Sequence, residues 1–344
     1  MRVIGRATQV LALAACMAFD AWAQPPAREP QVYMRKVGFQ DGEITDLESG
    51  KVVARVVPEK DDNEAVVVAV ARIKARPESL VEAMRKIETF RSGGRVLQIG
   101  RFSAPPRSED LRALVFDPDD LDDFSKCRVG NCEIQAPAQA MELAHQVDWK
   151  KPDANARATE LLKQALARLT QTYLEQGSTG LVVYDNNATP VSVRAEIDKI
   201  LQNSPNLMSY NPEFLQHLIE FPKGTLPNAE DFIYWSKEKL LKPVVSVAHV
   251  CIQRVTRGPD TGYFIAIKHI YDSHYFLADT EFLTLVPDGG DKSRFYLVDV
   301  VRARLDPPRK FRGLLLGKIK GSMKDAVATD VKATRQRLES TANP

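Results

Sequence analysis

The chain has 344 residues, of which 44% are hydrophobic and 27% are charged, and its formal net charge is +2. This is the composition of an ordinary globular protein, with enough chain for one large or two modest cores. Acidic and basic residues are interspersed without a basic block, which argues against nucleic acid as a partner. The chain has neither a Walker A pattern nor a G-x-G-x-x-G pattern, so no nucleotide cofactor is implied.

The beginning of the chain has the three parts of a secretory signal peptide. Arg2 and Arg6 form a basic region, residues 10–19 form an apolar stretch, and residues 21–23 (Ala-Trp-Ala) match a cleavage pattern. The apolar stretch is shorter than the roughly 20 residues that a membrane-spanning helix needs. We therefore predict cleavage after Ala23 and a periplasmic or secreted protein.

A second interpretation of the same segment is lipidation. Residues 13–16 (Leu-Ala-Ala-Cys) resemble a lipobox, in which Cys16 would become a lipid-anchored N-terminus and hold the protein at a membrane. Asp20 and the cleavage pattern that follows it favour simple cleavage. Both interpretations export the protein, and residues 24–32 are predicted to be a proline-containing linker.

Two cysteines flank a turn in the middle of the chain. Cys127 and Cys132 enclose a Gly-Asn pair, which in an oxidising compartment indicates a local disulfide. Redox-active pairs are usually closer together, haem attachment requires a histidine after the second cysteine, and a zinc site requires a second ligand pair. A reduced or metal-binding pair remains the alternative. Cys251 lies in an apolar run and is predicted to be a buried thiol.

The elements before residue 104 are predicted from apolar periodicity and turn residues. Residues 33–58 suggest two short strands joined by a polar turn. Residues 65–74 form a continuous apolar run typical of a strand buried on both faces. A helix begins near Pro77, and after Gly93 and Gly94 a further strand is predicted over residues 96–102.

The segment 104–243 is predicted to be mostly helical. Its acidic part, residues 117–124, lacks the glycine and the final glutamate of a calcium-binding loop, which indicates a solvated face or a helix start. One long helix is predicted over residues 154–175. Three shorter helices are predicted over residues 192–203, 211–221 and 228–241.

The last part of the chain returns to strands and ends in a helix. Strands are predicted over residues 244–254, 262–271, 280–286 and 294–304, and the short turns between them favour an antiparallel meander. A long helix is predicted over residues 310–339. Three glycines recur at every fourth residue of this helix, at 313, 317 and 321, which suggests close approach of another element or a ligand.

This order of elements resembles the START-like superfamily, also called Bet v 1-like or polyketide cyclase-like. The resemblance rests on AVARIKARPESLVEAMRKIETF followed by RVLQIGRF, and on the closing stretch from LVDVVRARLDPPRKF into the last helix. It implies an α+β fold in which a curved antiparallel sheet wraps around the long C-terminal helix. Residues 33–103 and 244–340 would form this domain, and residues 104–243 would be a helical insertion where usual members have strands.

The resemblance also implies a hydrophobic cavity between the sheet and the last helix, and hence a lipid-like small molecule as partner. No metal and no cofactor is expected. Strand parity does not place all of the candidate lining residues on one face, so they cannot all line one cavity. These candidates are Phe264, Tyr271, His274, Phe276, Tyr296, Leu314 and Leu315.

Two other functions remain open, and the sequence does not decide whether the protein is an enzyme. An enzyme on this fold, acting on a hydrophobic substrate, would use His274 or Asp299 as its acid or base. Asp299 either faces solvent or is buried with a partner such as Lys268, Arg302 or a ligand. A scaffold protein would instead expose an apolar patch on residues 154–241. The odd spacing of His269 and His274 places them on opposite faces of a continuous strand, which argues against a shared metal.

Overall fold

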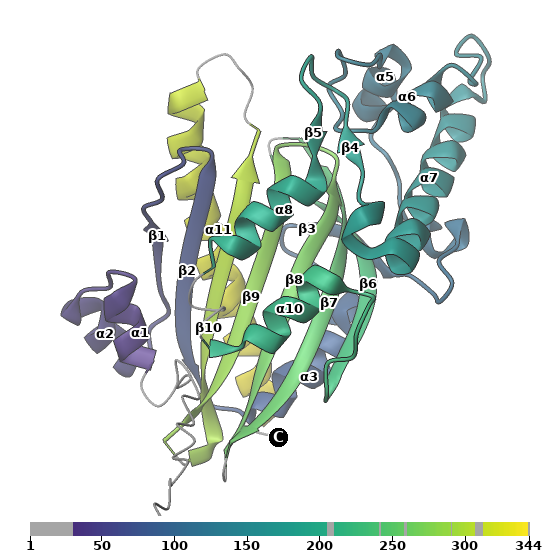
Figure 1. Ribbon diagram of the computed structural model, residues 1–344. Helices are drawn as coiled ribbons and strands as arrows, with labels where there is room; N and C mark the ends of the chain where they lie inside the picture. Colours follow the sequence, from purple (N-terminus) through teal and green to yellow (C-terminus); the bar gives the residue numbers. More distant parts are fainter. Residues whose placement is uncertain are drawn as a thin grey trace, which may run out of the picture.

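An eight-stranded antiparallel sheet forms the centre of the computed structural model, with the strand order β1-β2-β10-β9-β8-β7-β6-β3 (Figure 1). Strands β6 to β10 form a continuous meander, and β2 closes it on one side. A separate two-stranded ribbon consists of β4 (Val183–Tyr184) and β5 (Val191–Ser192). The strands of the sheet are β1 (Val53–Val57), β2 (Glu64–Ile73), β3 (Val96–Arg101), β6 (Ala229–Glu238), β7 (Val244–Arg257), β8 (Asp260–Asp272), β9 (Phe276–Asp288) and β10 (Asp291–Leu305).

The structure describes residues 30–204, 210–240, 242–257, 260–289, 291–306 and 312–342. The predicted signal peptide, Cys16 and the first part of the predicted linker lie outside them. The helices are α1 (Pro30–Lys36), α2 (Asp41–Glu48), α3 (Pro77–Arg85), α4 (Ile87–Phe90), α5 (Pro118–Lys126), α6 (Ala138–Ala144), α7 (Ala154–Gln176), α8 (Val193–Gln202), α10 (Pro212–Glu220) and α11 (Arg312–Ala342), with short 3₁₀ turns at Ser108–Leu111 and Gly177–Gly180. No helix within the described ranges is long and apolar enough to cross a membrane.

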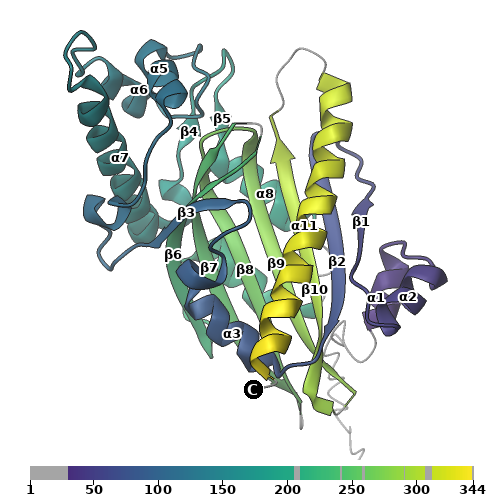
Figure 2. The same ribbon diagram turned by 180° about the vertical axis from the view of Figure 1, so that it is seen from behind.

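The long helix α11 lies across one face of the sheet, and α3 lies beside it (Figure 2). Val327, Val331 and Leu338 of α11 pack against every second residue of the central strands, in a core that also contains Leu80 and Met84 of α3. This arrangement confirms the predicted α+β class, with a large antiparallel sheet and a long C-terminal helix.

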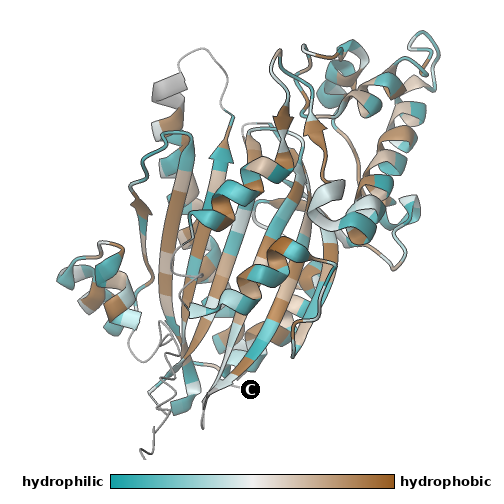
Figure 3. Ribbon diagram, in the orientation of Figure 1, coloured by the Kyte–Doolittle hydropathy of each residue, from teal (hydrophilic) through white to brown (hydrophobic). Residues whose placement is uncertain are grey.

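The opposite face of the sheet is also covered, by α8 and α10 at its centre and by α1 and α2 near the β1 edge (Figure 1). Apolar residues follow the central strands along their length, and α8 and α10 carry polar residues among their apolar ones (Figure 3). A strand covered on both faces needs apolar residues at every position, which explains the unbroken apolar run of β2.

Two predicted elements at the start of the chain are wrong. Residues 33–58 do not form two strands, because α1 and α2 precede the single strand β1. The backbone N–H of Gln40 donates to Glu43 at 2.7 Å, which completes a capping box at the start of α2. Ile44 and Leu47 then share one buried face of the helix. The polar turn expected here is therefore a helix start.

The helix predicted over residues 228–241 is also wrong, since this stretch contains β6. Phe232 and Tyr234 face α11, whereas Ile233 and Trp235 face the other core. Both sides of the strand are apolar, so it lacks the alternation of polarity that normally marks a strand. Because β6 pairs with β7 and β3, the segment 104–243 is helical only in its earlier part.

The remaining predicted elements agree with the structure. Helices α7, α8, α10 and α11, strand β3 and strands β7 to β10 lie within a few residues of their expected positions, and the acidic stretch begins α5. Cys127 and Cys132 form the predicted disulfide, with Cα atoms 4.4 Å apart, and Cys251 is a buried thiol. The close approach predicted from the glycines of α11 is not found at Gly317 or Gly321, where a Cβ would meet open space.

Candidate ligand-binding groove

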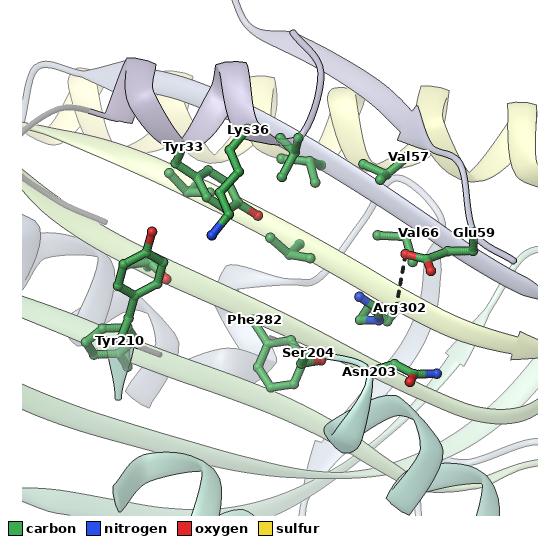
Figure 4. A pocket seen from close by; sticks show the side chains of 16 residues that line it. Tyr33, Lys36, Val57, Glu59, Val66, Asn203, Ser204, Tyr210, Phe282 and Arg302 are labelled. Atoms are coloured by element: carbon green, nitrogen blue, oxygen red, sulfur yellow. Dashed lines mark hydrogen bonds and ion pairs between the residues drawn. The ribbon is translucent and has the colours of Figure 1, made fainter. Parts of the chain in front are cut away.

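A groove of about 320 Å³ lies on the face of the sheet opposite α11. Strands β2, β10, β9 and β8 form its floor, α1 forms one wall, and the chain after α8 forms the other (Figure 4). Its lining consists of Tyr33, Lys36, Val37, Val57, Glu59, Val66, Val68, Asn203, Ser204, Tyr210, Phe264, Phe282, Thr284, Val298, Val300 and Arg302.

The floor of the groove is apolar because the strand register aligns valine and phenylalanine side chains. Floor residues on adjacent strands are direct partners in the sheet. Along each strand they alternate with the residues that face α11. The floor consists of one row with Val68, Val300 and Phe282, and a second row with Val298, Thr284 and Phe264. The result is a flat apolar surface that extends over four strands.

One end of the groove carries a positive charge. Lys36 is the last residue of α1, and Figure 4 shows it beside Tyr33, with Tyr210 across the groove. The Lys36 side chain is exposed, and its ammonium has no ion-pair partner among the residues that the structure describes. Burial of Tyr33 and Met34 against the strands fixes α1, and with it the position of this charge.

The charged groups at the other end of the groove are paired with one another. The Arg302 guanidinium lies 2.6 Å from Glu64 and 3.2 Å from Glu59. Burial raises the pKa of Glu59, although the charge of Arg302 opposes this shift. Asn203 donates to Glu64 at 3.3 Å and so connects the end of α8 to this network. The groove therefore has a net positive end at Lys36 and a paired end at Arg302.

The residues predicted to line a cavity are dispersed. Phe264 lines the groove. Tyr271 is buried against Tyr184, with ring centroids 6.2 Å apart, and Tyr296 donates its hydroxyl to Glu48 at 3.0 Å. Leu314 and Leu315 belong to α11, but their side chains lie outside the described part of the structure.

His274 and Phe276 lie near the turn between β8 and β9. The His274 ring contacts the backbone oxygen of Glu133 at 3.2 Å and Asp120 at 3.4 Å, and Phe276 packs in a small cluster near the N-terminal part of α11. The pairing register between β7 and β8 shifts before this turn, at the step from Val247 to Ala248 of β7. This irregularity explains why simple strand parity could not place the polar-aromatic segment 271–276.

The other titratable residues singled out in the sequence also lie apart from the groove. His269 contacts Asp272 at 2.9 Å, whereas His274 contacts Asp120 at 3.4 Å. Asp299 is buried on the α11 side of the sheet, so it does not face solvent. Its suggested partners Lys268 and Arg302 point to the opposite face.

A buried charged cluster occupies part of the space between the sheet and α11. Arg91 reaches both oxygens of Glu281, at 2.6 and 2.7 Å. Burial raises the pKa of Asp279 to about 7, and burial with the nearby Glu281 raises that of Asp299 well above its ordinary value. The resemblance implies an apolar cavity on this side, but the groove with an apolar floor lies on the other side.

Sequence reasoning missed most of the groove. Val68, Phe282 and Val300 were visible only as members of apolar strands, and Lys36 was placed in a predicted strand. The sequence does show which residues of a strand share a face, because successive side chains point to opposite faces of the sheet. It does not show which of the two faces carries a groove.

Comparison with known protein families, with curated proteins and with solved structures gives no significant match. The succession β2, α3 and α4, β3, β6 to β10 and α11 is compatible with a START-like fold. The Cys127–Cys132 disulfide is compatible with an oxidising compartment.

Proposed function

We propose that this is an exported protein of the START-like superfamily that binds an elongated hydrophobic molecule with an anionic end group, such as a fatty acid. The ligand lies in the groove, with its chain on the apolar floor and its charged end at Lys36. The observation that carries this proposal is the combination of a four-strand apolar floor with a cation at its end that has no ion-pair partner within the described ranges.

The size and chemistry of the groove support a small ligand. Its volume of about 320 Å³ is at the lower end of the range for small-molecule sites, roughly 300–1,000 Å³. Burial of apolar ligand surface contributes about 25 cal/mol per Å² before the costs of association. The charge of Lys36 selects among hydrophobic molecules, because a neutral end group forms no ion pair with it.

Export is supported by the signal-peptide pattern at the N-terminus and by the disulfide, which persists in oxidising compartments. The proposal moves the ligand from the α11 side of the sheet, where the resemblance alone would place it, to the opposite face. Neither His274 nor Asp299 lines this groove, so acid–base catalysis there is not part of the proposal.

Binding of a fluorescent fatty acid, dansylundecanoic acid, to the mature protein tests the proposal. Thr284 is half-buried in the floor, so Thr284→Trp should fill the groove and abolish binding. Lys36→Glu should weaken binding about tenfold at low salt, the order expected for loss of a charge-assisted contact. Lys332→Glu makes the same charge change on the exposed side of α11 and should leave binding unchanged.

The end group is tested separately with the corresponding alcohol, whose affinity should be the same for the wild type and for Lys36→Glu. Unchanged binding in folded Thr284→Trp would show that the ligand lies elsewhere. Equal weakening of acid and alcohol by Lys36→Glu would refute the role of its charge. Mass spectrometry of an organic extract from protein purified from its native host would identify a bound compound directly.

A further inference from the structure

A second cluster of functional side chains lies on the same face of the sheet as the groove, near the β6 side. It joins His217 of α10, Asp231 of β6 and Cys251 of β7. One ligand atom from each of the three residues lies within 4.8 Å of the other two. Asp231 and Cys251 are direct partners in the pairing of β6 with β7, and His217 Nε2 lies 3.1 Å from both carboxylate oxygens of Asp231.

The Asp231 carboxylate is held in place from behind by a hydrogen-bonded chain. His249 Nε2 lies 2.9 Å from Asp231 Oδ1, and the Tyr173 hydroxyl lies 2.8 Å from His249 Nδ1. The Tyr173 hydroxyl can donate to Nδ1, and His249 then donates the hydrogen on Nε2 to the Asp231 carboxylate, so both contacts are satisfied. His249 therefore orients the carboxylate, as partners of metal-binding carboxylates do.

The cluster has one side open to solvent. The Asp231 side chain is 24% exposed and that of His217 is 8% exposed, whereas Cys251 is fully buried. Phe221 covers the inner side, with its ring centroid 4.2 Å from that of His249. An ion can therefore reach the three ligand atoms from the Asp231 side without opening the core.

We propose that His217 Nε2, one oxygen of Asp231 and Cys251 Sγ bind a zinc ion. Nitrogen, oxygen and thiolate sulfur are the donor atoms that zinc uses, and three protein ligands leave a fourth tetrahedral position for water. When the ion binds, the Cys251 thiol releases its proton to solvent, and His217 offers the lone pair of Nε2 with its hydrogen on Nδ1.

A buried lysine nearby does not conflict with this site. Lys268 donates to the backbone oxygen of Leu218 at 2.7 Å, and its ammonium lies 5.1 Å from the centre of the Tyr173 ring. Its strand partner is His249, so it lies behind the orienting histidine. The two positive charges of zinc are matched by the Asp231 carboxylate and the Cys251 thiolate. The filled site is therefore neutral, so it places no net positive charge beside Lys268.

Titration of the tag-free mature protein with cobalt(II) tests the site. We expect one cobalt per chain, tetrahedral visible bands, and the near-ultraviolet charge-transfer band of a thiolate ligand. Zinc should displace the cobalt. Cys251→Ser should remove the charge-transfer band, and His217→Asn should weaken zinc binding at least tenfold, as expected for loss of a ligand or its support. His145→Asn, an exposed histidine elsewhere, should leave both unchanged.

The cobalt spectrum of the wild-type protein tests the metal site even if Cys251→Ser fails to fold. Folded wild-type protein without a stoichiometric thiolate-to-cobalt band would overturn it, and so would a folded Cys251→Ser variant that retains the band. Binding of dansylundecanoic acid is measured on the same samples. Loss of dansylundecanoic acid binding with an intact cobalt spectrum would contradict the proposed function alone. Normal binding of the fatty acid without the cobalt spectrum would contradict the metal site alone.

Discussion

At the scale of single residues, one carboxylate is buried in the fold with an oxygen that lacks a hydrogen-bond partner within the described chain. Asp299 is 4% exposed, and its Oδ1 has no hydrogen-bond partner within the described chain. Burial raises its pKa well above the ordinary value, and the negative charge of Glu281 adds to the shift. A group whose folded pKa exceeds its unfolded pKa lowers stability as the pH rises through that interval.

We therefore predict that Asp299→Asn stabilises the protein at pH 7 by about 1 kcal/mol or more, because the amide has no charge to desolvate. The gain should disappear near pH 4, where the unfolded aspartate is itself about half protonated. Urea unfolding at the two pH values measures both effects. Asp62→Asn, at an exposed carboxylate, is the matched control and should change little. A loss of stability at pH 7 would mean that the ionised carboxylate has a favourable partner.

At the scale of elements, the end of α7 determines how the helical segment meets the sheet. Gly177 follows α7 with a φ of +60°, and a Cβ at this position would lie 1.7 Å from the backbone oxygen of Phe221. The Phe221 ring in turn stacks on Tyr173, 5.4 Å between centroids, and contacts His249. The close approach of two backbones at Gly177 thus helps to position the residues behind Asp231.

Gly177→Ala should lower the free energy of unfolding by about 3 kcal/mol or more, because a left-handed conformation and a backbone clash act together. Gly224 also has a positive φ, of +84°, but a Cβ there meets nothing within 4 Å. Gly224→Ala should therefore cost only about 1–2 kcal/mol. Chemical denaturation of both variants gives the comparison, and equal losses would show that the contact with Phe221 can relax without cost.

The elements themselves were predictable where apolar periodicity was strong. The helix α7 and the meander β7 to β10 follow from spacing alone, and Pro77 marked the start of α3. Prediction from the sequence failed where tertiary contacts determine the secondary structure. Strand β6 is buried on both faces and has no alternation, and α1 and α2 are short helices whose apolar residues are needed to cover β2 and β10.

The sites were much less predictable than the elements. The groove floor joins four strands, and its cation comes from a helix far away in the sequence, so no local spacing marks it. The metal-ligand cluster is equally hard to predict from the sequence, because His217 reaches Asp231 only after α10 folds back over β6. The disulfide was predictable because its two cysteines are close in sequence and need only a turn between them.

At the scale of the whole molecule, buried titratable groups make stability depend on pH in opposite directions. Burial lowers the pKa of His249 to about 4, below the unfolded value of about 6.5, so stability falls as the pH drops through this interval. Burial lowers the pKa of Lys268 to about 8, which favours the folded state progressively above that pH. Between these two ranges, the groups on the α11 side of the sheet decide the outcome.

His269 and Asp299 both act in that middle range, and Asp299 lowers stability as the pH rises because burial raises its pKa. Burial alone would lower its pKa, but the charges of Asp272 and Asp279 and the hydrogen bond to Asp272 raise it to about 10. Glu238 adds to the same shift. Below pH 6.5 both the folded and the unfolded chain hold this proton. Above it, the unfolded chain releases the proton and the folded chain keeps it, so stability falls as the pH rises.

We therefore predict that His269 by itself makes the free energy of unfolding about 1 kcal/mol lower at pH 8 than at pH 7, close to the full value for one proton per pH unit. His269→Asn keeps a hydrogen-bond donor toward Asp272 but has no titrating group, so the decline due to Asp299 should remain and the contribution of His269 should vanish. His145→Asn, at an exposed histidine, should retain it. Denaturant unfolding at the two pH values makes the measurement. If the decline is as large in His269→Asn as in the wild type, the paired His269 cation does not contribute to the pH response.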